Sequence, residues 1–109
     1  MIAKLVSLFT GSKGVAEKVI VDNPDQHDEI YKRGSELISP HMKLLKRDPK
    51  VTKRVRDEVT RGIRDLDAVT TFNPKNWPAF WIKGKGYQVL GDQVSANIEF
   101  RSSFAIQKE

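Results

Sequence analysis

Metal-ligand side chains are concentrated in one acidic stretch of this sequence, from Asp22 to Glu29. The stretch contains His27 two residues after Asp25, and both are possible ligands. A calcium loop alternates oxygen ligands around a glycine at its sharp turn, and this stretch has no glycine. Its Asn-Pro pair instead favours a turn that leads into a helix. We therefore expect no metal site here.

Two glycine clusters have the composition of a phosphate-binding loop. They span Gly11 to Gly14 and Gly84 to Gly86. A nucleotide-binding loop has the spacing GxxxxGK[ST] directly after a strand, and neither cluster has both features. The sequence also contains no cysteine and no nucleophile elbow. We therefore expect neither a cofactor nor an enzymatic activity.

Positive charge is concentrated in the middle of the chain. Nine of the 19 basic residues lie between Lys43 and Arg64, against three acidic residues, and the whole chain has a net charge of +5. A small nucleic-acid-associated protein is therefore the alternative function, with a basic helix that neutralises phosphates. The residues of that helix are Lys50, Lys53, Arg54, Arg56, Arg61 and Arg64. Because Asp57 and Glu58 lie at helical spacing from Arg61, and aromatic residues are absent nearby, a solvated helix face is the simpler interpretation.

The composition fits a single globular domain of 109 residues. Apolar residues make up 39% of the chain, and no run of about 18 apolar residues is present, so we expect no membrane span. The N-terminal sequence MIAKLVSLFTG is interrupted by Lys4 and Ser7 and lacks a clear cleavage site, which argues against a signal peptide. We expect a cytoplasmic protein in which this segment covers an edge of the core. Contact with a membrane surface is the alternative.

Apolar residues recur at helical spacing along the chain, and no segment shows the sustained alternation of a half-buried strand. This pattern predicts an all-α fold. Two short helices are expected within residues 1–24, over Ile2 to Phe9 and Val15 to Ile20. A third helix is expected to run from about His27, with Asp25 as its cap.

The rest of the chain is divided by proline and glycine into longer helical segments. A new segment is expected to start at Pro40, and the longest one at Asp48-Pro49. The apolar stripe of that longest segment is Val51, Val55, Val59, Ile63, Leu66, Val69 and Phe72. A helical hairpin follows, over Trp77 to Leu90 and Gln93 to Gln107, with the turn at Gly91-Asp92.

This hairpin resembles one tetratricopeptide repeat, a helix-turn-helix unit of about 34 residues. The positions that match the repeat are Pro74, Phe80, Gly84, Tyr87, Gly91, Asp92, Ala96 and Phe100. Two positions depart from its pattern, since Lys83 stands where the family has an apolar residue and Ser103 where it has alanine. The resemblance covers a little over a quarter of the chain.

The preceding region repeats part of the same pattern. Ile30 and Gly34 have the spacing of the aromatic residue and glycine in the first helix of the hairpin, and Gly62 and Leu66 have that of the small and aromatic residues in its second helix. Gly34 and Gly84 are 50 residues apart, which is more than one repeat. The expected division is therefore an N-terminal helical segment, a degenerate or long-helix first unit and a matching repeat, over residues 1–24, 25–74 and 75–109.

The resemblance implies a right-handed array of antiparallel hairpins that binds protein or peptide segments and performs no chemistry. In such arrays the first helix of each unit lines the inner face, which places Trp81, Lys85 and Gln88 on the binding surface. Tyr31 and Lys32 occupy similar positions in the first unit. A tryptophan beside a lysine suits an apolar side chain and a carboxylate, so we expect an acidic peptide. A core position for Trp81 is the other interpretation.

The last helix is apolar on two sides. One side is Ala96, Phe100 and Phe104, and the other is Val94, Ile98 and Ala105. One apolar side suffices for packing on the partner helix. We therefore expect the second side to be covered by the N-terminal segment or by another copy of the protein, in a homodimer.

Overall fold

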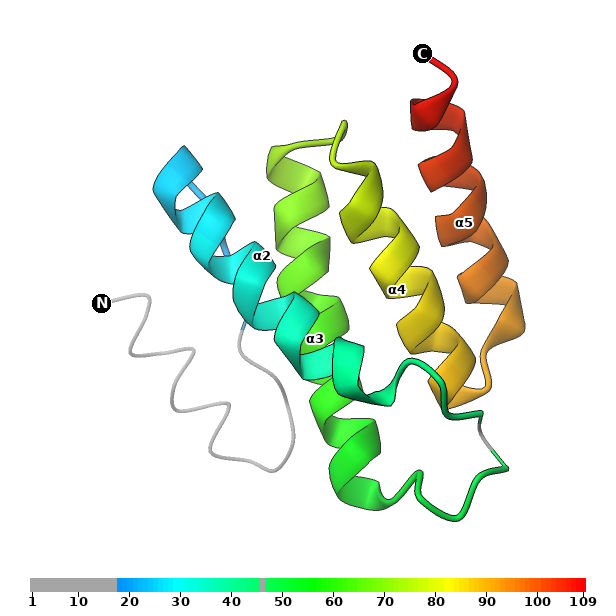
Figure 1. Ribbon diagram of the computed structural model, residues 1–109. Coiled ribbons are helices and arrows are strands. Elements are labelled where there is room, and N and C mark those ends of the chain that lie inside the picture. The colour runs from blue at the N-terminus through cyan, green and yellow to red at the C-terminus, as the bar shows by residue number, and fades with distance from the viewer. Residues whose placement is uncertain (1–17, 46) are drawn as a thin grey trace.

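Each α-helix among the described residues of the computed structural model begins at a side chain that accepts a hydrogen bond from a free backbone N–H. These N-cap residues are Asn23, Thr52, Asn76 and Asp92. They start α2 (Pro24–Ile38), α3 (Lys53–Phe72), α4 (Trp77–Leu90) and α5 (Gln93–Gln107) (Figure 1). The structure describes residues 18–45 and 47–109, in which helices and turns occur but no strand. The prediction of an all-α fold is therefore confirmed.

The start of α2 differs from the expected one. The helix begins at Pro24, and its cap is Asn23 rather than Asp25. The side-chain oxygen of Asn23 accepts a hydrogen bond from the Gln26 N–H at 2.9 Å, which satisfies one of the free donors of the first turn. Pro24 fits the first helical position because its missing N–H has no partner there in any helix.

The connection between α2 and α3 also differs from the prediction. Pro40 does not start a longer helix, because only one 3-10 turn forms, over Ser39–His41. Nε2 of His41 lies 2.9 Å from Oε1 of Glu58, which ties this turn to α3. The long helix then begins at Lys53, after its Thr52 cap, and not at Asp48-Pro49.

The N-terminal part of the described chain is not helical. Lys18 to Asp22 have no helical structure, so a short helix through Val19 and Ile20 was a wrong prediction. The short helix expected over Ile2 to Phe9 lies outside the described residues. Within residues 18–45 and 47–109, no helix is both long and apolar enough to cross a membrane.

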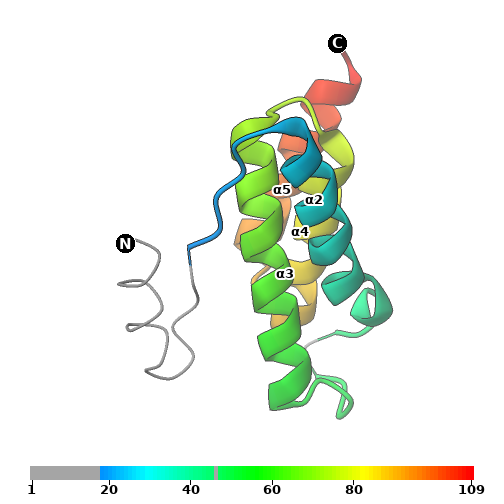
Figure 2. The ribbon, with the colours of Figure 1, turned by 90° about the vertical axis from the view of Figure 1, so that its left-hand side faces the viewer.

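The four helices form two antiparallel hairpins. α2 packs against α3, and α4 packs against α5 (Figures 1 and 2). α4 also packs on both helices of the first hairpin, whereas α5 packs mainly against α4 and lies at the edge of the molecule (Figure 1). α4 therefore has neighbouring helices on most of its circumference, and α5 on one side.

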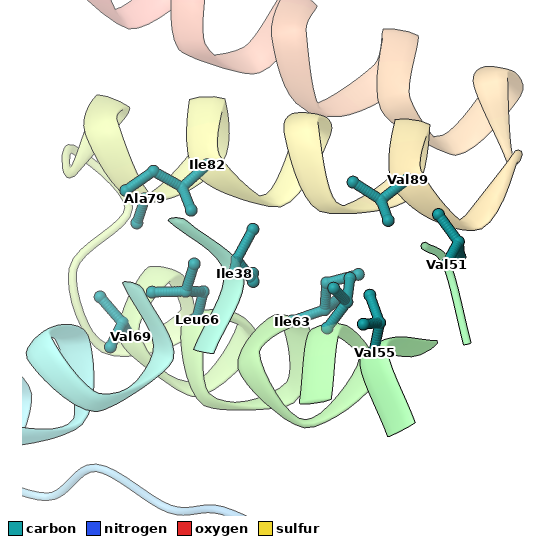
Figure 3. Close-up of a cluster of buried hydrophobic side chains, with 10 residues drawn as sticks. Ile38, Val51, Val55, Ile63, Leu66, Val69, Ala79, Ile82 and Val89 are labelled. Atoms are coloured by element: carbon teal, nitrogen blue, oxygen red, sulfur yellow. The ribbon is translucent and has the colours of Figure 1, made fainter. Parts of the chain in front are cut away.

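The hydrophobic core lies between α2, α3 and α4. Ile38, Leu66 and Val89 come from these three helices and are fully buried. Figure 3 shows side chains of α3 and α4 facing each other across this core, with Ile38 between them and Val51 at one end. The apolar stripe predicted for the long segment thus packs in the core, except for Phe72, which is partly exposed.

Each hairpin closes on a glycine. A Cβ atom on Gly62 of α3 would lie 2.6 Å from Cγ1 of Ile38 and 2.8 Å from the carbonyl oxygen of Gly34. A Cβ atom on Gly84 of α4 would lie 2.5 Å from the ring of Phe100. These separations are shorter than any van der Waals contact, so the helices approach this closely only because the glycines have no side chain.

Gly62→Ala is expected to destabilise the protein by about 1–3 kcal/mol, because the new methyl group meets a backbone carbonyl that cannot move without shifting α2. The matched control is Gly86→Ala, whose methyl group would meet only the side chains of Ile63 and Ile38, at 3.2 Å or more. In this control a gain in helix propensity of about 1 kcal/mol offsets the crowding. Urea unfolding would measure both variants, and an equal loss of stability would contradict this account.

Candidate functional site

Each hairpin contains an ion pair between its two helices, at corresponding positions in the two hairpins. In the first, Arg33 of α2 donates from Nε and Nη2 to the carboxylate of Asp65 on α3, at 2.8 and 2.7 Å. In the second, Nζ of Lys83 on α4 lies 3.1 Å from Oε1 of Glu99 on α5. In both hairpins the cation comes from the first helix and the buried or largely buried acid from the second.

The residues next in sequence after these pairs are also equivalent. Leu66 follows the acid of the first hairpin and packs on Gly34, where a Cβ atom would lie 3.1 Å from its Cδ2. Phe100 follows the acid of the second hairpin and packs on Gly84. First helices are thus related by a shift of 50 residues and second helices by a shift of 34. We call positions related by these shifts equivalent.

Lys83 lies at the centre of a buried polar cluster that joins three helices. Its side chain is only 5% exposed. Its Nζ lies 3.0 Å from Oδ1 of Asp67 and 3.1 Å from Oγ1 of Thr70, both on α3, in addition to Glu99 on α5. The ring of Phe80 lies 4.8 Å below the ammonium. Lys83 therefore donates two hydrogen bonds and forms an ion pair with Glu99, which meets the need of a buried lysine for oxygen partners.

Sequence analysis identified Lys83 only as a departure from the tetratricopeptide pattern. The cluster explains the departure, since the lysine at this position joins acids from two other helices. Tyr87, one turn further along α4, lies near the same acidic side chains. Burial, followed by the negative charges of Asp67, Glu99 and Asp92, raises the pKa of its hydroxyl group above the ordinary value.

Two of the predicted site residues lie together on the surface of α4. Trp81 is 37% exposed and does not belong to the buried core cluster. Nζ of Lys85, one turn further along, lies 5.7 Å from the centroid of the Trp81 ring, at the distance of a cation–π contact. Gln88 is half-buried on the same side of the helix. The interpretation of Trp81 as a core residue was therefore wrong.

The two predicted residues of α2 have separate surroundings. Tyr31 is half-buried, packs against the core and stacks on His27, with the ring centroids 6.4 Å apart. Nε2 of His27 in turn lies 3.2 Å from Nδ2 of Asn76, the cap of α4. Lys32 is exposed. Tyr31 thus contributes to the packing of α2 on the start of α4, while Lys32 lies on the surface of α2.

The basic residues proposed for nucleic-acid binding lie mostly on the exposed side of α3. Lys53 pairs with Asp57 at 3.0 Å, and Arg54 lies 3.5 Å from Glu58. The hydrogen bond from His41 lowers the pKa of Glu58, and the nearby positive charge of Arg54 adds to this. Asp57 and Glu58, expected to pair with Arg61, thus have other partners. Acid–base pairs at helical spacing reduce the excess positive charge of this face.

A cleft of about 850 Å³, which sequence analysis did not predict, lies between the irregular segment at the start of the described chain and α3. It is lined by Lys18 to Val21 on one side and by Arg64, Ala68 and Phe72 on the other. The lining combines apolar side chains with charged groups from both segments. Among the described residues, no group of three or more histidine, aspartate or glutamate side chains could hold a metal ion.

The outer side of α5 is exposed in the described part of the molecule. Val94 is 74% exposed, and Ile98 and Ala105 are exposed as well. The N-terminal segment expected to cover these residues falls mainly on residues 1–17, outside the described chain. The homodimer stays a prediction.

Comparison with known proteins found no matching family model, no matching curated protein and no matching solved structure.

Glu99→Ala is expected to destabilise the fold by about 3 kcal/mol, because it leaves the buried Lys83 ammonium with too few partners. The double variant Lys83→Met, Glu99→Leu removes both charges and is expected to regain most of that loss. Asp57→Ala, which breaks the exposed pair with Lys53, is the control and should change little. Chemical unfolding would measure all three, and a double variant as unstable as Glu99→Ala would contradict the role of the cluster.

Proposed function

We propose that this protein is a non-enzymatic interaction module that binds a peptide or protein segment through the surface of α4. The observation that carries the proposal is the exposed Trp81 with the Lys85 ammonium over its ring. A large aromatic side chain on the surface, held beside a cation, is typical of the residues that dominate binding energy at protein interfaces.

The chemistry of this surface favours one class of ligand. The Trp81 ring offers an apolar surface, and the Lys85 ammonium offers charge to a carboxylate. The amide of Gln88 adds a donor and an acceptor on the same side of α4. An acidic peptide that carries a large apolar side chain matches these three groups.

The resemblance to tetratricopeptide repeats agrees with this proposal. Support comes from the two hairpins, which share the ion pair and the glycine contact at equivalent positions. Stacked equivalent hairpins place their first helices, α2 and α4, next to each other. In the resembled family these helices line the surface that binds other proteins.

Nucleic-acid binding by the basic helix stays the alternative. Lys50, Arg56, Arg61 and Arg64 are the residues of that group for which no ion pair is found in the described structure. Such binding would weaken steeply as salt rises, because it depends on release of counterions from phosphates. Retention on an immobilised oligonucleotide across a salt series would identify this function.

Trp81→Ala is expected to weaken binding about 30-fold, corresponding to about 2 kcal/mol, for peptides selected from a random library on the immobilised wild-type protein. Lys85→Ala is expected to give a smaller loss that shrinks at high salt. Phe72→Ala, which truncates a similarly exposed aromatic residue on α3, is the matched control. Calorimetric titration would give the affinities, and thermal melting would show that each variant is folded.

Two outcomes would contradict the proposal. One is a folded Trp81→Ala variant that binds every selected peptide as tightly as the wild type. The other is a library that yields no binder while the protein is retained on the oligonucleotide and released by salt.

A further inference from the structure

The groove of the first hairpin shows how this protein accommodates a helix. α4 lies across both α2 and α3. Its Gly86 packs between Ile63 of α3 and Ile38 of α2, where a Cβ atom would lie 3.2 and 3.3 Å from their side chains. Beside this contact, Lys83 of α4 pairs with Asp67 of α3 at 3.0 Å. The groove therefore combines an apolar contact with one acid that receives a cation from the incoming helix.

The equivalent surface of the second hairpin, formed by α4 and α5 and here called its groove, has no further helix of the described chain packed across both helices (Figure 1). We propose that this groove binds an acidic amphipathic helix of a partner protein, which lies across α4 and α5 as α4 lies across α2 and α3. The inference rests on the proposed function, because Trp81 belongs to the groove. The inference adds to that function that the ligand is a helix and that its carboxylates face the cations of this groove.

Three exposed aromatic residues lie along this groove. Trp77 is 41% exposed, Trp81 37% and Phe104 52%. The hydroxyl group of Ser103 donates a hydrogen bond to the Trp77 carbonyl oxygen at 3.1 Å. Because Phe104 is the next residue after Ser103, Trp77 and Phe104 lie at the same end of the hairpin. Trp81 lies one turn from Trp77 on α4, and Phe104 lies one turn from Phe100 on α5. In the first hairpin, the residues equivalent to Trp77 and Trp81 are His27 and Tyr31, and both are half-buried.

The charge in the second groove is opposite to that in the first. Arg101 of α5 is equivalent to Asp67 of α3, the acid that receives Lys83. Lys85 adds a second cation beside Trp81. Among the described residues, no carboxylate forms an ion pair with Arg101 or Lys85. An incoming helix therefore needs a carboxylate where α4 carries Lys83.

The α2 helix of a second copy of this chain does not meet that requirement. If its α2 entered the groove as α4 enters the first one, Arg33 would take the place of Lys83 and would face Arg101, a contact between like charges. The residues at the places of Ala79, Ile82 and Gly86 would be Glu29, Lys32 and Glu36, which offer no apolar surface to the exposed aromatic residues.

Residues 1–17 also have the wrong charge for this groove. Their ionisable residues are Lys4, Lys13 and Glu17, which give a positive balance. Their apolar residues match the exposed aromatic side chains, but no acid accompanies them within the stretch from Ile2 to Phe9. A different protein that supplies an acidic amphipathic helix fits both the aromatic and the cationic part of the groove.

The test uses two designed helical peptides of about 18 residues, long enough to form a helix when bound. Both carry leucine and alanine along one face. One has glutamate along the edge of that face and its twin has lysine at the same positions. Fluorescence anisotropy with labelled peptides and the full chain is expected to show the glutamate helix binding at least about tenfold more tightly than its twin.

Arg101→Glu is expected to reverse that preference, so that the lysine helix becomes the tighter ligand. Arg47→Glu makes the same change of charge in the exposed connection before α3 and is expected to leave the preference unchanged. Phe104→Ala is expected to weaken the glutamate helix at least about tenfold without changing its preference over the twin. Circular dichroism melting would confirm that each variant is folded.

The possible failures are distinguishable. Equal binding of the two helices, or an equal effect of Arg101→Glu and Arg47→Glu, would overturn the inference. If library peptides depend on Trp81 while Arg101→Glu leaves both helices unaffected, docking of an acidic helix is wrong and the proposed function stands. If Arg101→Glu reverses the preference while Trp81→Ala changes no affinity, the groove is confirmed and Trp81 is not its anchor.

Discussion

The close contact between paired helices is the constraint on which the rest of this structure depends. Gly34 and Gly62 bring α2 and α3 so near that a methyl group on either would overlap the opposite helix. This proximity places Arg33 within reach of Asp65, and the buried acid is stabilised only because the guanidinium reaches it with two hydrogen bonds. Glycine and ion pair are therefore parts of one packing unit, which the second hairpin repeats in altered form.

Lys83 extends this unit from two helices to three. In the first hairpin the side chain of Arg33 is more than half exposed, whereas the side chain of Lys83 is buried in contact with α3 and α5. Burial is possible because Asp67 and Thr70 add acceptors from α3, next to the acid on α5. Since α5 packs mainly on α4, the ion cluster also ties the edge helix to the centre of the molecule.

Periodicity and turn residues were enough to predict the helical fold, the apolar stripe of α3 and the bounds of α4 and α5, because these depend on local sequence. The prediction of a new helical segment from Pro40 was wrong, since only a single turn forms there, and a tertiary contact joins its His41 to α3. The burial of Lys83 was not predictable, and for Trp81 the sequence left a surface position and a core position open. α4 is apolar on several sides, and only its packing against three other helices decides which residues remain outside.

The distribution of exposed aromatic residues follows from the same repetition. In the first hairpin, the positions of His27 and Tyr31 are partly covered by the start of α4, so large side chains there contribute to stability. In the second hairpin, Trp77 and Trp81 occupy the equivalent positions, and no following helix of the described chain covers them. Their exposed surface adds nothing to the stability of the monomer, and clustered exposed aromatic residues are a mark of binding surfaces. This edge of the described chain thus has the side-chain composition of a contact between helices.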